Sequence, residues 1–214
     1  MLVKERMTSP ALTIGPEVGV QDALAMMRRD KVRRYPVVDR RGNLIGIISE
    51  KDLLNAAPSE ATSLSVWEIN YLLSKLTVEK IMTKDVITIT PDIPIEEAAR
   101  IMADRKVGGL PVIEGTKMVG IVTETNLFRV LLELFGARTP GVRLTARVED
   151  EPGKLAQLAN VIHDIGGNII TLGTYQGKAT GSGMMVIKVG RVDIEVLKKA
   201  VAPYVLEITD IRLA

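Results

Sequence analysis

Two short segments of the sequence each place a hydroxyl three residues before a carboxylate or an amide. Ser49 is followed by Asp52, and Thr123 is followed by Asn126. On the first turn of a helix such side chains share one face, where they can bind the paired hydroxyls of a ribose. Helix capping alone explains the same spacing, because Ser and Thr are preferred caps and Asp offsets the helix dipole. Both interpretations stay open at this point.

Two consecutive arginines stand ahead of the first of these segments. Arg33 and Arg34 precede an apolar-Pro-Val strand, and guanidinium groups bind phosphate through permanently charged, bidentate contacts. A solvated basic surface is the alternative, since Arg28, Arg29 and Lys31 are close in sequence.

Groups that could carry covalent or metal chemistry are scarce. The sequence has no cysteine and one histidine, His163, which falls in a predicted C-terminal helix. Gly177-Lys178 lacks the flanking residues of a phosphate-binding loop, and no GxGxxG pattern occurs. Catalysis needs a nucleophile, a base or a metal cluster. The sequence therefore predicts a binding protein and not an enzyme, with no catalytic cofactor and no metal site.

The composition is that of a globular protein. Of 214 residues 46% are hydrophobic and 25% charged, with a formal net charge of +2. Aromatic residues make up only 3%, which argues against nucleic-acid binding. No apolar run approaches the ~18 residues of a membrane span, and no signal peptide is recognisable. We therefore expect a cytoplasmic protein with no membrane or nucleic-acid partner, in keeping with the absence of cysteine.

An internal repeat organises the first two thirds of the chain. A shift of 75 residues aligns Met7-Thr8 with Met82-Thr83 and Pro36-Val37 with Pro111-Val112. In each copy the sequence predicts a short strand, around Leu12–Ile14 in the first, then a helix, two strands joined by a tight turn, and a closing helix capped by Ser49 or Thr123. Two such units would pack as a pseudo-symmetric pair to cover their sheets.

A helix is predicted between the two copies, over residues 61–77. It opens with the capping-box pattern Ser65-Val66-Trp67-Glu68 and continues with apolar residues at helical spacing. Trp67 and Tyr71 on this helix either line a ligand cleft or cover the core.

The duplicated unit, with its Gly-apolar-apolar-Ser/Thr ending and its apolar-Pro-Val strand, resembles a pair of CBS domains. The resemblance covers residues 1–60 and 78–136, on either side of the connecting helix. It implies a Bateman module that binds an adenosine-containing regulatory ligand, such as AMP, ADP, ATP or S-adenosylmethionine, and that performs no catalysis.

The resemblance also implies a set of nucleotide-binding positions. Asp52 would hold the ribose with Ser49 beside it, and Arg33 and Arg34 would face phosphate. The positions bordering the adenine would be Thr13, Tyr35 and Pro36. Their counterparts in the second repeat, together with those of Ser49 and Asp52, are Thr88, Leu110, Pro111, Thr123 and Asn126.

The two clefts are expected to differ. Gly108 and Gly109 replace the two arginines in the second repeat, and Asn126 replaces the carboxylate. Glycines offer no cation, and an amide binds ribose without the strengthening effect of charge. We therefore predict one stronger nucleotide site.

Residues 141–214 follow a different pattern, with the element order βαββαβ. The pattern Asp150-x-Pro152-Gly153-x-Leu155, followed by Asn168-Ile169, resembles an ACT domain with a ferredoxin-like fold. This resemblance implies a small effector, commonly an amino acid, near Asp150, Gly153, Asn168 and Ile169. A domain that only dimerises has the same element order, so both roles stay open.

The whole chain is thus expected to be an α/β (α+β) protein, a CBS pair followed by an ACT domain. This combination is similar to the acetoin-utilisation accessory proteins of bacteria. That similarity implies a regulatory role in acetoin or related carbon metabolism, a homodimer and an unidentified target protein. The alternative is an oligomerisation scaffold that binds no ligand and regulates a partner protein.

Overall fold

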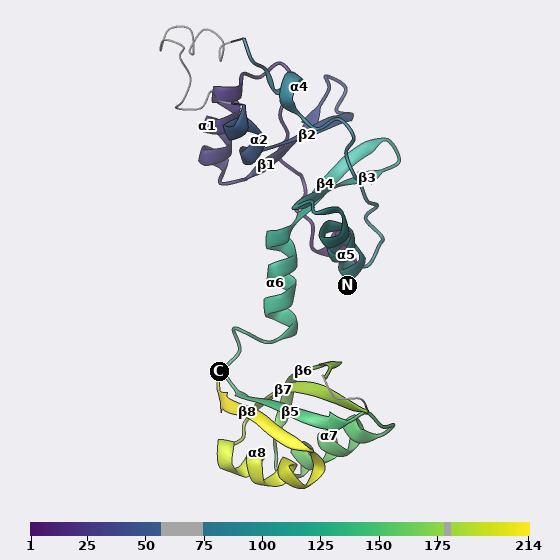
Figure 1. Ribbon diagram of the computed structural model, residues 1–214, viewed down its shortest axis with the longest axis vertical. Coiled ribbons are helices and arrows are strands. Elements are labelled where there is room, and N and C mark those ends of the chain that lie inside the picture. The colour runs from purple at the N-terminus through teal and green to yellow at the C-terminus, as the bar shows by residue number, and fades with distance from the viewer. Residues whose placement is uncertain (57–74, 178–180) are drawn as a thin grey trace. The chain divides into compact units, whose positions relative to one another are not determined.

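The computed structural model describes residues 1–56, 75–177 and 181–214 (Figure 1). The chain divides into two compact units, Met1–Leu127 and Phe128–Ala214. Residues 61–74 of the predicted connecting helix, with Trp67 and Tyr71, lie outside the described residues. Within the described ranges no helix is long and apolar enough to cross a membrane.

The first repeat contains four of the five elements that its sequence predicts; the predicted strand Leu12–Ile14 is reduced to an isolated bridge between Ile14 and Val37. The four elements are α1 (Val20–Asp30), β1 (Arg34–Val38), β2 (Leu44–Ser49) and α2 (Glu50–Asn55). The two strands form an antiparallel hairpin, and the helices lie beside each other in Figure 1. Their core contains the side chains of Val20, Ala23 and Met27, which the helical spacing places on one face of α1.

The second repeat opens with the short helix α4 (Val78–Ile81) and then follows the same order. Its further elements are α5 (Ile95–Arg105), β3 (Gly109–Glu114), β4 (Lys117–Thr123) and α6 (Glu124–Leu134). β3 and β4 again pair antiparallel. The last helix, α6, begins in the first unit and continues into the second.

Each repeat is completed by the opening segment of the other repeat. The N-terminal segment, which includes the short helix η1 (Val3–Glu5), joins the second repeat, where Val3 N–H donates to the Ile93 carbonyl over 3.0 Å. Conversely, the opening segment of the second repeat joins the first, where Thr83 and Ile47 form a bridge with two hydrogen bonds of 2.9 Å. The two repeats are therefore interlocked.

Two glycines allow these segments to lie directly against the hairpins. A Cβ atom on Gly46 of β2 would come within 3.1 Å of the Thr83 carbonyl oxygen, and one on Gly120 of β4 within 2.9 Å of the Thr8 carbonyl oxygen. Any larger residue would push the segment away from its strand. This explains the Gly in both copies of the Gly-apolar-apolar-Ser/Thr ending.

The second unit has the predicted βαββαβ order. Its four strands form an antiparallel sheet in the order β6-β7-β5-β8, and α7 and α8 cover one face (Figure 1). The final strand begins at Glu207, two residues later than the alternation predicts, after a short 3₁₀ helix. The elements are β5 (Val142–Glu149), α7 (Lys154–Asp164), β6 (Asn168–Gln176), β7 (Ser182–Gly190), α8 (Ile194–Val201), η2 (Ala202–Tyr204) and β8 (Glu207–Leu213).

Candidate functional site

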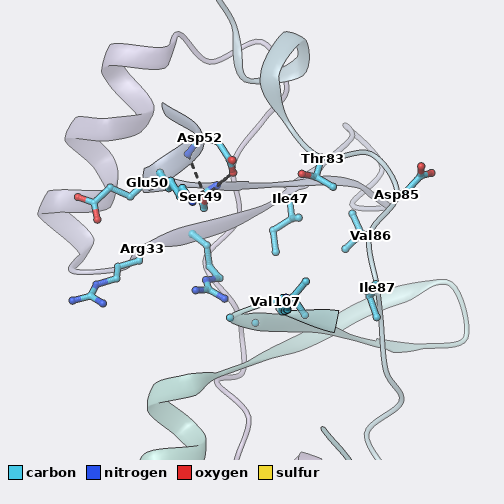
Figure 2. A pocket seen from close by; sticks show the side chains of 15 residues that line it. Arg33, Ile47, Ser49, Glu50, Asp52, Thr83, Asp85, Val86, Ile87 and Val107 are labelled. Atoms are coloured by element: carbon cyan, nitrogen blue, oxygen red, sulfur yellow. Dashed lines mark hydrogen bonds between the residues drawn. The ribbon is translucent and has the colours of Figure 1, made fainter. Parts of the chain in front are cut away.

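A cleft of about 480 Å³ lies in the first unit, and Figure 2 shows its lining. Four parts of the chain meet there. They are the start of β1, the junction of β2 and α2, the interlocked segment before α5, and the turn that leads into β3. The lining residues are Arg33, Arg34, Ile47, Ser49, Glu50, Lys51, Asp52, Thr83, Asp85, Val86, Ile87, Lys106, Val107, Gly108 and Gly109.

Four of the predicted nucleotide-binding residues line this cleft together: Arg33, Arg34, Ser49 and Asp52. The hydroxyl and the backbone N–H of Ser49 both donate to Asp52 Oδ2, over 2.6 and 2.9 Å. Asp52 N–H donates back to the Ser49 hydroxyl over 3.3 Å, which completes a capping box at the start of α2. The predicted helix cap is therefore confirmed.

Capping does not use all of the Asp52 carboxylate. Within the described part of the chain, its second oxygen, Oδ1, accepts no hydrogen bond. An ionised carboxylate oxygen can accept two donors, so Oδ1 can receive hydroxyl groups from a ligand while Oδ2 holds the cap. The two interpretations of the Ser49–Asp52 spacing are thus compatible.

The cleft combines apolar walls with a small excess of positive charge. Ile47, Val86, Ile87 and Val107 supply apolar surface of the kind that covers a planar base. The lining also contains four cations and three carboxylates. The cations are Arg33, Arg34, Lys51 and Lys106, and the carboxylates are Glu50, Asp52 and Asp85.

Arg34 is the more deeply placed of the two arginines. Its side chain is 19% exposed, and its nearest carboxylate is that of Glu124, with 4.0 Å between Nη2 and Oε2. Burial lowers the pKa of Arg34 by disfavouring its charged form, although the guanidinium stays protonated at any physiological pH.

The equivalent position in the second repeat is arranged differently. Thr123 donates its N–H and its hydroxyl to Asn126 Oδ1 over 2.9 and 2.7 Å, as Ser49 does to Asp52. Asn126 Nδ2 then donates to the Arg6 carbonyl over 2.9 Å, and the residue is only 6% exposed. The amide is therefore engaged on both sides. Neither Thr123 nor Asn126 lines the 480 Å³ cleft.

The structure does not bring the predicted adenine-bordering residues of the first repeat into this cleft. Tyr35 is fully buried, and its hydroxyl donates to Asp30 Oδ2 over 2.5 Å. This burial, helped by the hydrogen bond, raises the pKa of Tyr35 to about 12. Pro36 is also buried, and Thr13 lines a separate hollow of about 210 Å³. Neighbouring residues of a strand point to opposite sides. Because Arg34 points to the cleft, Tyr35 points into the core.

Their counterparts in the second repeat also lie elsewhere. Leu110 and Pro111 are buried in β3, and Thr88 lines a third hollow, of about 370 Å³.

Several of the lining residues that sequence reasoning missed come from the interlocked segment. Thr83, Asp85, Val86 and Ile87 line the cleft together with residues of the first repeat, although they belong to the start of the second repeat in sequence. The Met82-Thr83 pair marks this segment, because the same pair opens the first repeat. The periodicity alone does not say which repeat the segment completes.

In the second unit, the structure does not bring the predicted effector-binding residues together. Asp150 follows the end of β5 that pairs with the start of β7, whereas Asn168 pairs with Gly190 at the end of β7. Asp150 is exposed, and Gly153 is the N-cap of α7 with a φ of +87°. Asn168 begins β6 and is exposed, whereas Ile169 packs against the core. His163 is exposed on α7, as expected of a helix-surface residue. None of these residues lines the three hollows described above.

No group of three or more acidic or histidine side chains among the described residues is placed to hold a metal ion.

The first unit is a duplicated module, in which two interlocked α/β repeats form the cleft. The βαββαβ unit is a separate C-terminal domain. The family model of the CBS domain matches residues 3–59 and 78–133, and that of the TTHA0829-like ACT domain matches residues 140–212. The chain belongs to the CBS domain family and carries a C-terminal ACT domain.

Curated relatives match the chain over about two thirds of its length. A CBS domain-containing protein of Dictyostelium discoideum is 33% identical over 135 residues, which are 63% of this chain and 93% of that protein. The L-aspartate semialdehyde sulfurtransferase of Methanocaldococcus jannaschii is 30% identical over 138 residues, which are 64% of this chain. The match spans only 24% of the sulfurtransferase.

Solved structures match about two thirds of the chain, and two of them hold ligands. The CBS domain pair of protein MJ0100, in complex with 5′-methylthioadenosine and S-adenosyl-L-methionine, is 28% identical with a TM-score of 0.52, over 65% of this chain and 98% of that one. CBSX2 of Arabidopsis thaliana, in complex with AMP, is 31% identical with a TM-score of 0.51, over 61% and 96%. A putative acetoin utilization protein of Vibrio cholerae is 28% identical with a TM-score of 0.54, over 64% and 95%.

Proposed function

We propose that the chain is a regulatory protein, not an enzyme, and that its first unit binds an adenosine-containing ligand in the 480 Å³ cleft. The observation that carries this proposal is the Asp52 carboxylate, which lines the cleft with one oxygen free of hydrogen bonds within the described residues. Apolar side chains suit the base, and two arginines suit phosphate. The ligands of protein MJ0100 and CBSX2 share the adenosine moiety.

Asp52 would bind the ribose hydroxyls through Oδ1, with Ser49 holding the carboxylate in place. Ile47 and Val107 would contact the base from opposite repeats, and Arg33 and Arg34 would meet the phosphate. The equivalent groups of the second repeat are engaged with the N-terminal segment. One dominant site per chain is therefore proposed.

A thermal-shift screen with AMP, ADP, ATP, S-adenosylmethionine and 5′-methylthioadenosine tests this proposal. A ligand that binds only the folded state stabilises it by about 2.7 kcal/mol at a concentration a hundredfold above Kd. We expect a shift for wild type that is lost in Asp52→Ala and kept in Asp22→Ala. Asp22 is the matched control, because it also lies in the first turn of a helix but outside the cleft.

Two results would contradict the proposal. Hydrolysis of ATP that disappears in Asp52→Ala would show an enzyme. A lack of shift with every adenosine compound would favour the scaffold that binds no ligand. The scaffold has one observation in its favour, the exposed apolar side chains of Phe128, Leu131 and Phe135, which are 64%, 47% and 45% exposed.

We also propose that the protein is a homodimer, whether it binds a ligand or acts as a scaffold. Measuring its molecular mass in solution tests this.

We further propose that the ACT domain binds a small effector such as an amino acid, or mediates dimerisation. The similarity to the putative acetoin utilization protein supports a role in acetoin or related carbon metabolism. A thermal-shift screen of amino acids against wild type and Asp150→Ala tests the effector. A shift that persists in the variant would move the site away from Asp150.

A further inference from the structure

Arg34 reaches from the first repeat onto the backbone of the second. A Cβ on Gly109 would lie 2.6 Å from Arg34 Nη1, and one on Gly108 would overlap the same guanidinium. The guanidinium therefore occupies the space that two side chains would otherwise fill. This placement exists because the second repeat has glycines where the first has arginines.

The charge of Arg34 is only loosely compensated in this position. Its single ion-pair partner among the described residues is Glu124, at 4.0 Å, and no hydrogen bond joins the two. Glu124 is 61% exposed, whereas Arg34 is 19% exposed. An ion pair of this length with a solvated carboxylate is weak, so a closer anion can displace it.

Glu124 is the first residue of α6, the helix that runs on into the second unit. Arg34 also lines the cleft that holds Asp52. One guanidinium thus stands between the proposed ligand site and the first turn of α6.

We propose that Arg34 is shared between Glu124 and the ligand, so that a phosphate group entering the cleft takes the guanidinium away from α6. This inference rests on the proposed function and adds a distinction between ligands. A phosphate-bearing adenosine compound forms bidentate hydrogen bonds to Arg34 and releases Glu124 to solvent. An adenosine compound without phosphate fills the cleft and leaves the ion pair in place.

Calorimetric titration of the full chain with AMP and with adenosine tests the exchange. Glu124→Gln removes the competing carboxylate, so we expect it to tighten AMP binding roughly two- to fivefold and leave adenosine binding unchanged. Glu96→Gln is the matched control, because it makes the same change in the first turn of another helix, away from the cleft. Its AMP affinity should equal that of wild type.

The same titration in an Arg34→Gln background isolates the pair. In that background Glu124→Gln should no longer tighten AMP binding, because the guanidinium through which it acts is absent. A gain that persists without Arg34, or an equal gain for adenosine, would overturn the inference while leaving the proposed function intact. Absence of binding by wild type and every variant would overturn both. Thermal unfolding of each variant without ligand checks that it folds.

Discussion

The side-chain amide of Asn126 donates a hydrogen bond to the backbone carbonyl of Arg6, 120 residues away in sequence, over 2.9 Å. Asp52 holds the corresponding place in the first repeat, where a carboxylate accepts hydrogen bonds and has no amide group to donate one. The two repeats thus differ at this position. Asn126 binds the N-terminal segment, whereas Asp52 keeps an acceptor that a ligand can use.

Asn126→Asp should destabilise the protein by about 1–3 kcal/mol, because the donor to Arg6 is lost and two acceptors then face each other at a partly buried position. Urea unfolding at neutral pH measures the loss. Asp52→Asn is the control and should change stability by less than about 1 kcal/mol, because Asn Oδ1 can still accept the capping bonds from Ser49. Equal effects of the two variants would contradict this account.

Gly46→Ala should cost about 1–3 kcal/mol of stability, although alanine usually stabilises a strand. The added Cβ would lie 3.1 Å from the Thr83 carbonyl oxygen, which belongs to backbone and cannot easily move. In Gly183→Ala the nearest atom is 3.9 Å away, so this control should be neutral or slightly stabilising. Thermal unfolding of both variants provides the comparison, and a stable Gly46→Ala would show that the segment can shift.

Tyr35→Phe should reduce the decline in unfolding free energy that the wild-type protein shows at alkaline pH. Burial and the hydrogen bond to Asp30 raise the pKa of Tyr35 from 10.0 to about 12, so the folded state favours the protonated hydroxyl. Its contribution is fully present below the unfolded pKa and is lost as pH rises through the folded one. Urea unfolding from about pH 9 to pH 12 should therefore show a shallower decline for Tyr35→Phe than for wild type.

At neutral pH the same variant should be less stable by about 0.5–1.5 kcal/mol, the usual net value of a hydrogen bond. Tyr175→Phe, at a position that is 53% exposed, is the control and should follow wild type at every pH. A decline in Tyr35→Phe as steep as in wild type would assign the alkaline transition to other groups.

Gly108→Ala should displace the Arg34 guanidinium without unfolding the protein, because the added Cβ meets the free end of a flexible side chain. We expect AMP affinity to fall roughly three- to tenfold and adenosine affinity to hold. Calorimetry on the variant, and on the same variant carrying Arg34→Gln, measures the effect. If Gly108→Ala lowers AMP affinity just as much in the Arg34→Gln background, the effect does not act through Arg34 and this prediction is wrong.

Local patterns in the sequence predict most of the elements correctly. The helical spacing of Val20, Ala23 and Met27 predicts α1, and Ser49 predicts the start of α2. These features depend on neighbouring residues, so the sequence carries them directly. The final strand begins two residues late because Ala202–Tyr204 forms a 3₁₀ turn, which alternation of apolar residues does not reveal.

The lining of the cleft is harder to predict, because it depends on which repeat each connecting segment completes. A 75-residue periodicity is the same whether Thr83 packs on the first hairpin or on the second. The position of Tyr35, by contrast, follows from a local rule. Alternation along β1 places it away from Arg34, although the family resemblance assigns both to one ligand.

The interlocked segments also set the order of events during synthesis. Val3 pairs with Ile93, so the N-terminal segment has no partner until about 90 more residues have been made. At 5–20 residues per second this takes roughly 5 to 20 s, during which the apolar side chain of Val3 has no core to enter. The first repeat likewise lacks Thr83 until that residue leaves the ribosome. Neither repeat can therefore complete its packing before the opening segment of the other is available.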